Sequence, residues 1–171
     1  MNRTRAMAQR ARDLSMTLDL TPPFRPEVFV TRLAANQGLT IPLIPFPMFE
    51  SVTGYVLRSS ESRYIIFYDP ASVYRSIYHE CGHIVLNHVP ISAPEEIEQF
   101  LSAYNTLTLP VLLRSRFGKP KELDAEAFSI AMTALSTAAS ATIHSTRSLL
   151  NAQEIIKPSE IGQFYDDMGL R

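Results

Sequence analysis

One helix, expected between residues 69 and 87, most constrains how this chain can fold, because only a narrow part of its surface is polar. Asp69 is placed to cap it, with Pro70 at its first position. At about 100° per residue, one arc of roughly 100° collects its polar side chains: Ser72, Ser76, His79, Glu80, His83 and Asn87. A solvated face typically carries long charged side chains, and this arc holds no lysine or arginine. The pattern therefore favours a largely buried helix with one functional polar stripe over an exposed amphipathic helix.

The segments before this helix predict a small sheet. Residues 53–58 and 64–68 are the clearest strands, and a turn-like serine-rich segment separates them. The second strand is apolar throughout, as expected for a strand covered on both faces. Residues 39–46 are extended, and Pro42 and Pro45 confine them to a sheet edge or to irregular chain.

Helices are expected around this sheet, at residues 2–18, 26–38, 94–105, 119–140 and 158–167. The 171 residues, 46% of them hydrophobic and 19% charged, suit one globular domain. We predict an α+β fold: a mostly helical single domain, residues 1–171, with a small three-stranded sheet packed beside the helix of residues 69–87. Its core is expected at about residues 25–140, preceded by a helix within 1–20 and followed by a helical extension at 145–171.

Composition restricts the partners and the cellular compartment expected for this protein. The formal net charge of −1 gives no electrostatic reason to expect direct nucleic-acid binding. The lone cysteine, Cys81, excludes an internal disulfide framework and fits a reducing compartment. The first twenty residues lack the apolar run of a secretory signal, and residues 128–145 are expected to form a buried helix rather than a membrane span. We predict a soluble cytoplasmic protein with no membrane partner.

The polar stripe contains the pattern His-Glu-x-x-His, from His79 to His83. Residues four apart on a helix lie about 40° apart around its axis, so both imidazoles can reach one metal ion. Neutral imidazole suits zinc, and two histidines leave room for a third protein ligand and a water molecule. Glu80 lies beside the pair, where it can accept a proton from the attacking water and later pass it to a leaving amine.

Three neighbours of the pattern receive different interpretations. His88 follows His83 by five residues, the wrong spacing for a shared metal, so we expect a helix-end or partly buried histidine. Gly82 is expected to allow close packing behind the ligands, and Cys81 faces the core as a small apolar residue rather than a ligand.

The third ligand must come from elsewhere in the chain. His144 is the only histidine outside residues 79–88. Carboxylates are the alternative, because Glu122 and Glu126 lie one turn apart on a narrow polar stripe of an otherwise apolar helix. Glu122 as ligand and Glu126 as hydrogen-bond acceptor for a ligand imidazole would explain both. The competing interpretation makes them first-turn carboxylates favoured by the helix dipole.

Three features, in this order, resemble the ImmA/IrrE metallopeptidases, which are found with mobile elements and stress-response regulators. They are an apolar strand leading into the His-Glu-x-x-His helix, an apolar run ending at His88, and Glu-x-x-Ala-x-x-Phe-small at residues 122–129. The resemblance covers about residues 25–135, and it implies a zincin-like fold with Glu122, rather than Asp124 or Glu126, as the third zinc ligand.

The same resemblance implies a Zn2+-dependent endopeptidase that cleaves a specific protein, such as a helix-turn-helix transcriptional repressor or an antitoxin. In that mechanism His79, His83 and Glu122 hold zinc, and Glu80 acts as general base and then acid. The substrate is expected to add a strand to the sheet edge, with residues 53–58 one candidate. The alternative is a non-proteolytic regulator or toxin that acts by contact and keeps a structural or vestigial metal site. An intact Glu80 favours the enzyme, since a structural zinc needs no general base.

Overall fold

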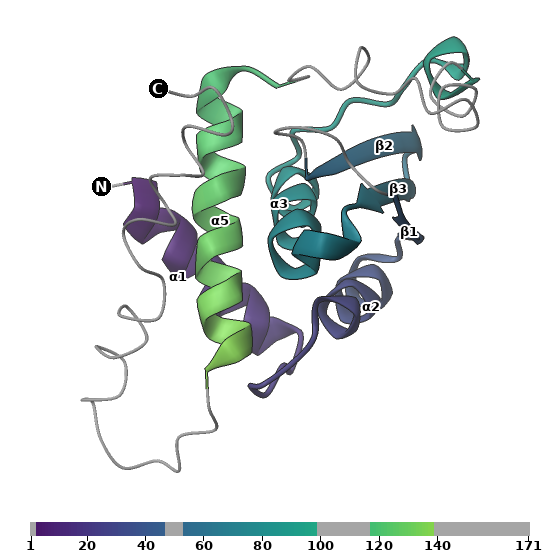
Figure 1. Cartoon of the computed structure of the whole chain (residues 1–171). Coiled ribbons are helices and arrows are strands. Elements are labelled where there is room, and N and C mark those ends of the chain that lie inside the picture. The colour runs from purple at the N-terminus through teal and green to yellow at the C-terminus, as the bar shows by residue number, and fades with distance from the viewer. Residues whose placement is uncertain (1–2, 47–52, 99–116, 139–171) are drawn as a thin grey trace, which may run out of the picture.

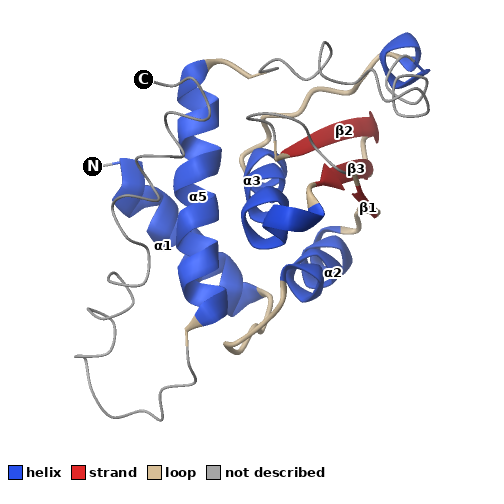
Figure 2. Cartoon of the chain, in the orientation of Figure 1, coloured by secondary structure: helices blue, strands red, loops and turns tan. Residues whose placement is uncertain are grey.

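The computed structural model describes residues 3–46, 53–98 and 117–138, and within them it confirms a mixed α+β fold with a three-stranded sheet. The helices and the sheet are coloured separately in Figure 2. The elements, labelled in Figure 1, are α1 (Arg3–Thr17), α2 (Pro26–Gln37), β1 (Leu43–Pro45), β2 (Gly54–Ser60), β3 (Arg63–Tyr68), α3 (Val73–Val85) and α5 (Lys119–Thr137).

The sheet has the order β1-β3-β2, with β3 parallel to β1 and antiparallel to β2. The proline-containing strand β1 therefore lies at an edge, as the sequence predicted. The apolar strand β3 occupies the centre, and its Ile66 and Phe67 are almost completely buried. Strand β2, which includes most of the candidate substrate-binding segment at residues 53–58, forms the other edge of the described sheet.

Local interactions determine how the chain enters α3 and where this helix ends. The side chain of Asp69 accepts a hydrogen bond from the backbone N–H of Ala71 at 3.0 Å, and a 3-10 turn, Pro70–Ser72, leads directly into the helix. Asp69 therefore caps this 3-10 turn, whereas α3 itself begins at Val73, later than predicted, and Ser72 at its N-cap position makes no side-chain cap hydrogen bond. The helix ends at Val85, two residues before the expected end, because Asn87 adopts a left-handed backbone conformation with a φ of 53°.

Helix α3 lies in the middle of the molecule, with the sheet on one side and α5 on the other (Figure 1). Helix α1 packs against α5, and α2 packs against α3. Because neighbours cover α3 from several directions, every residue from Ser76 to Ile84 is buried. The prediction of a largely buried helix is correct. Ser76, His79, Glu80 and His83 of its polar stripe face protein, whereas Asn87 is exposed beyond the end of the helix.

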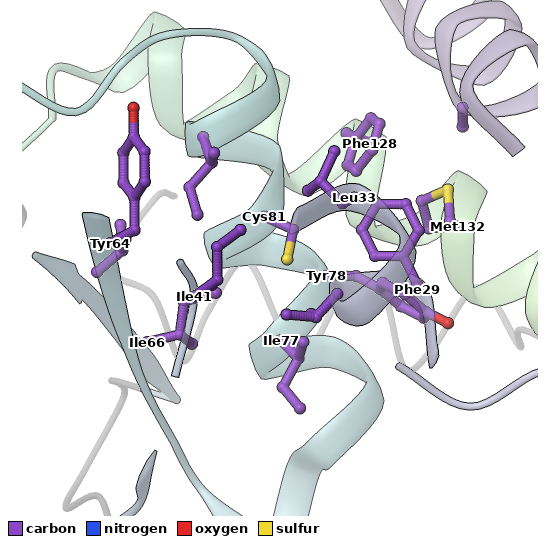
Figure 3. Close-up of a cluster of buried hydrophobic side chains, with 14 of the residues drawn as sticks. Phe29, Leu33, Ile41, Tyr64, Ile66, Ile77, Tyr78, Cys81, Phe128 and Met132 are labelled. Carbon is purple, nitrogen blue, oxygen red and sulfur yellow. The ribbon is translucent and has the colours of Figure 1, made fainter. Parts of the chain in front are cut away.

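The core forms where α2, α3 and α5 meet (Figure 3). The rings of Phe29 and Tyr78 pack edge to face, with centroids 5.5 Å apart, and Phe128 lies beside them. Cys81 is fully buried within this cluster, as expected for a small apolar residue.

Gly82 is the point of closest approach between α3 and α5. A Cβ atom on Gly82 would lie 3.0 Å from the Cα atom and 3.1 Å from the carbonyl oxygen of Ala125. These distances are shorter than ordinary carbon contacts of about 3.5–4.0 Å. The absence of a side chain therefore allows the two backbones to pack together, which confirms the role predicted for this glycine.

Several predicted segments extend beyond the described residues. Residues 94–98 are helical, whereas residues 99–105 of the same predicted helix lie outside the described part of the chain. The predicted helix at 158–167, the extension at 145–171 and His144 also lie outside it. Among the helices that the structure describes, none combines the length and apolar character that a membrane crossing requires.

We predict that Gly82→Ala lowers the free energy of unfolding of the metal-free protein by about 1–3 kcal/mol, because the added methyl group pushes α3 away from α5. In an unconstrained helix interior the same change would stabilise by about 1 kcal/mol. Urea unfolding with a chelator present measures the effect. Gln37→Ala, at the exposed end of α2, is the control and should stay within about 0.5 kcal/mol of wild type. A Gly82→Ala protein as stable as wild type would show that the close contact does not constrain the packing.

Candidate metal centre

Three buried donor atoms converge between α3 and α5. The Nε2 atom of His79 lies 3.2 Å from the Oε2 atom of Glu122 and 3.2 Å from the Nε2 atom of His83. The Nε2 atom of His83 lies 3.6 Å from the same oxygen of Glu122. One ligand atom from each residue falls within 4.8 Å of the other two, so this His-His-Glu group could hold a metal ion.

The packing of two helices explains this convergence. His79 and His83 lie one turn apart on the same side of α3, and Glu122 lies in the first turn of α5. Glu122 precedes Ala125, which contacts Gly82, by three residues. The close contact at Gly82 therefore brings the first turn of α5 within reach of both imidazoles.

Glu126 contacts the other side of His79. Its Oε2 atom lies 3.3 Å from the Nδ1 atom of His79, and its side chain is buried. A carboxylate in this position fixes the orientation of a ligand imidazole and increases its basicity. The structure thus places both glutamates of the α5 stripe at the site, in the arrangement that the sequence suggested.

His83 has two neighbours that the sequence analysis did not assign to the site. The Nδ1 atom of His88 lies 3.1 Å from the Nδ1 atom of His83. The ring of Phe117 stacks on His83, with centroids 4.1 Å apart and planes inclined by 25°. Excluding His88 as a metal ligand agrees with the cluster of donor atoms, but the sequence did not predict its contact with His83. The sequence signal for the contact with His88 was Asn87, because asparagine often adopts the left-handed conformation that ends a helix. The contact with Phe117 depends on tertiary packing and has no such signal.

Glu80 is buried beside the cluster without belonging to it. Its side chain occupies the space next to Gly54, the first residue of β2, where a Cβ atom would lie 2.9 Å from the Cγ and Oε1 atoms of Glu80. Burial raises the pKa of Glu80 to about 7, although the neighbouring His79 opposes the rise. A carboxyl group with a pKa near neutrality is well suited to accepting and returning a proton.

The pKa values of the three donor residues are shifted in different directions. Burial alone would lower the pKa of His79, but hydrogen bonds to Glu122 and Glu126 raise it to about 10. Burial opposes ionisation of Glu122, yet the hydrogen bond from His79 and the proximity of the His83 ring lower its pKa to about 2. Burial lowers the pKa of His83 to about 4. Without a metal, the positive charge therefore resides on His79, between two carboxylates.

This donor set suits a divalent transition metal. Two imidazole nitrogens and one carboxylate oxygen provide three protein ligands, the number found in catalytic zinc sites, where a fourth position receives water or substrate. The same set can also bind iron or manganese. A metal cation would replace the proton on His79 as the countercharge of Glu122 and Glu126.

Comparisons of the chain with protein-family models, with curated proteins and with solved structures found no match.

We predict that the purified wild-type protein, after reconstitution with zinc, binds about one metal ion per chain. His79→Ala and Glu122→Ala should lose most of it, because each removes one of the three converging donors. Glu80→Gln should keep it, because Glu80 is not among them. Elemental analysis measures the content. Asp124→Ala, two residues from Glu122 and paired with Arg3, is the matched control and should bind as wild type does. Equal binding by Glu122→Ala would exclude Glu122 as a ligand.

Metal affinity is also expected to rise with pH. His79 must lose its proton to bind a metal, and its pKa is about 10, whereas His83, with a pKa of about 4, is already neutral. Between about pH 6 and 8 one proton should leave per metal bound, so affinity should increase about tenfold per pH unit. Competition with a chromophoric chelator across this range measures the slope. A flat profile would mean that His79 is not protonated in the metal-free site.

Proposed function

We propose that this protein is a zinc-dependent endopeptidase, with Glu80 as the general base and acid. The observation that carries the proposal is that a carboxylate outside the donor set is buried beside it, with a pKa near 7. A structural zinc normally takes four protein ligands and needs no base, whereas a catalytic zinc leaves one position open. The proposal therefore accounts for both the three donors and the extra carboxylate.

The residues of the site have distinct roles in peptide hydrolysis. A bound zinc ion would supply Lewis-acid polarisation of the scissile carbonyl and of water. Glu80 accepts a proton from the attacking water as the new carbon–oxygen bond forms. It then transfers that proton to the amide nitrogen as the carbon–nitrogen bond breaks. Gly54 leaves the space in which the Glu80 side chain can occupy this position.

The sheet offers a place for an extended substrate. The backbone N–H of Ser92 donates a hydrogen bond to the carbonyl of Arg58. Because Ser92 is not part of β3, the backbone of Arg58 must face away from that strand. Strand alternation gives Val56 and Gly54 the same orientation. A peptide that pairs with β2 at Gly54 and Val56 would pass close to Glu80, whose side chain lies beside Gly54. We therefore propose that the substrate is an extended segment of another protein.

The motif resemblance to the ImmA/IrrE metallopeptidases supports a regulatory substrate, such as a helix-turn-helix repressor or an antitoxin. Three features of the described chain agree with that resemblance: a sheet leading into α3, the His-Glu-x-x-His pattern on α3, and Glu122 beside both histidines. They support an enzyme of regulatory proteolysis, and we propose from the lone cysteine that it acts in a reducing compartment, the cytoplasm.

We predict that the zinc-loaded protein cleaves a peptide library prepared by tryptic digestion of a bacterial proteome, and that Glu80→Gln abolishes the new amino termini. Loss of a general base lowers rates by about 10²–10⁴-fold. Mass spectrometry of newly formed amino termini measures cleavage and reports the sequence preference. Metal content is measured on the same samples, because Glu80→Gln must retain zinc for the comparison to be valid.

Glu61→Gln, an exposed carboxylate in the turn between β2 and β3, is the matched control and should cleave as wild type does. Gly54→Ala should retain metal but cleave more slowly, because its methyl group displaces Glu80. If wild type binds zinc stoichiometrically and yields the same termini as Glu80→Gln, a regulator acting by contact becomes the better account.

A further inference from the structure

The end of α3 places the next histidine in the chain against a metal ligand. Asn87 has a φ of 53°, its backbone N–H donates to the carbonyl of Ile84 at 3.0 Å, and the N–H of His88 donates to the carbonyl of His83 at 2.8 Å. These two bonds and the left-handed residue define a Schellman motif, which ends a helix by turning the chain back over its last turn. In this motif the side chain that follows the left-handed residue commonly contacts the one five positions earlier, here His83.

The contact between these two side chains is polar. The Nδ1 atoms of His83 and His88 are 3.1 Å apart, a hydrogen-bond distance. Phe117 lies against both rings, with centroids 4.1 Å from His83 and 6.4 Å from His88. The imidazole pair is therefore held by the helix end on one side and by an aromatic ring on the other.

The backbone around His88 is fixed as well. The Arg10 side chain of α1 donates to the carbonyl of Val85 at 2.9 Å, which holds the last turn of α3. Val89 is buried in the core. The N–H of Ser92 then bonds to the carbonyl of Arg58 in β2 at 2.8 Å. Anchors on both sides thus keep the His88 ring beside His83.

The role of His83 as a metal ligand determines which of its nitrogens carries the proton. Its Nε2 atom faces the other two donors, 3.2 Å from Nε2 of His79 and 3.6 Å from Oε2 of Glu122, so a metal held by the three residues would take the Nε2 lone pair. The ring proton of His83 then resides on Nδ1, which lies 3.1 Å from Nδ1 of His88 and can donate a hydrogen bond to it.

We propose that His88 is a positioning residue for the metal ligand His83. By accepting the Nδ1 hydrogen bond, it keeps the Nε2 lone pair of His83 exposed and directed toward Glu122 and His79. His88 does not touch the metal or the substrate. The inference rests on the proposed function only in treating His83 as a metal ligand.

The test replaces the acceptor while preserving the helix end. His88→Leu fills similar space without an acceptor, His88→Ala removes the ring without adding bulk, and His88→Asn returns an oxygen near the position of Nδ1. Affinity for cobalt(II), measured from its visible absorption in competition with a chelator, should fall by about 10–100-fold in the leucine and alanine variants. The asparagine variant should bind nearly as tightly as wild type.

A second readout examines the hydrogen bond itself. Long-range nitrogen–proton correlation NMR of the metal-free proteins reports the tautomer of His83. We expect the Nδ1–H form in wild type and in His88→Asn, and a mixture with the Nε2–H form in His88→Leu and His88→Ala. Matching thermal unfolding curves of the metal-free variants identify those that remain folded, and the alanine variant replaces leucine if the latter does not fold.

The outcomes separate this inference from the proposed function. Unchanged cobalt affinity and an unchanged His83 tautomer in a folded variant that lacks the acceptor would overturn the role of His88. If wild type itself binds no cobalt, the proposed peptidase fails, and the tautomer of His83 still decides whether His88 accepts its hydrogen bond.

Discussion

The contact between Gly82 and Ala125 is the constraint on which both the core and the candidate site depend. It lets the backbones of α3 and α5 approach more closely than two helices with side chains at the interface could. Glu122 and Glu126, on either side of Ala125, then reach the two sides of one imidazole ring. Because the donors come from two helices far apart in sequence, no complete site exists before the helices pack. Metal binding should therefore also stabilise the folded protein.

The buried ionisable groups at this interface stabilise one another, and none of them would be stable there alone. An isolated buried carboxylate is costly, and three of them, Glu80, Glu122 and Glu126, are buried here. A proton on His79 compensates two of them, and Glu80 responds to burial with a raised pKa. A cation of higher charge in the same place would satisfy the carboxylates better than one proton. The metal-free electrostatics thus support a metal site more strongly than the distances alone.

The sequence predicted the features that depend on local patterns. The Asp69 cap, the central strand β3, the proline-bearing edge strand and the polar stripe of α3 each follow from residues close together in the chain. Glu122 and Glu126 were identifiable because two carboxylates on an otherwise apolar helix require partners. Phe117 and Gly54 were not, because each contacts a residue on another element and carries no signature of its own. His88 was correctly excluded as a donor and is a partly buried residue just past the helix end, as expected. Its contact with His83 was not predicted, because it depends on the turn that Asn87 makes at the end of the helix.

The two histidines of the candidate centre are held in different ways, and this difference ties the site to the whole fold. His79 is oriented by Glu126, so its position depends on the packing of α5. His83 is oriented by His88, so its position depends on how α3 ends and on the anchoring of the following segment to β2. Glu80 in turn occupies the space left by Gly54 on that same strand. A carboxylate acceptor strengthens the basicity of its imidazole more than a neutral ring does. We therefore expect His79 to form the stronger bond to a metal and His83 to be the ligand more sensitive to changes at the sheet edge, where a substrate would bind.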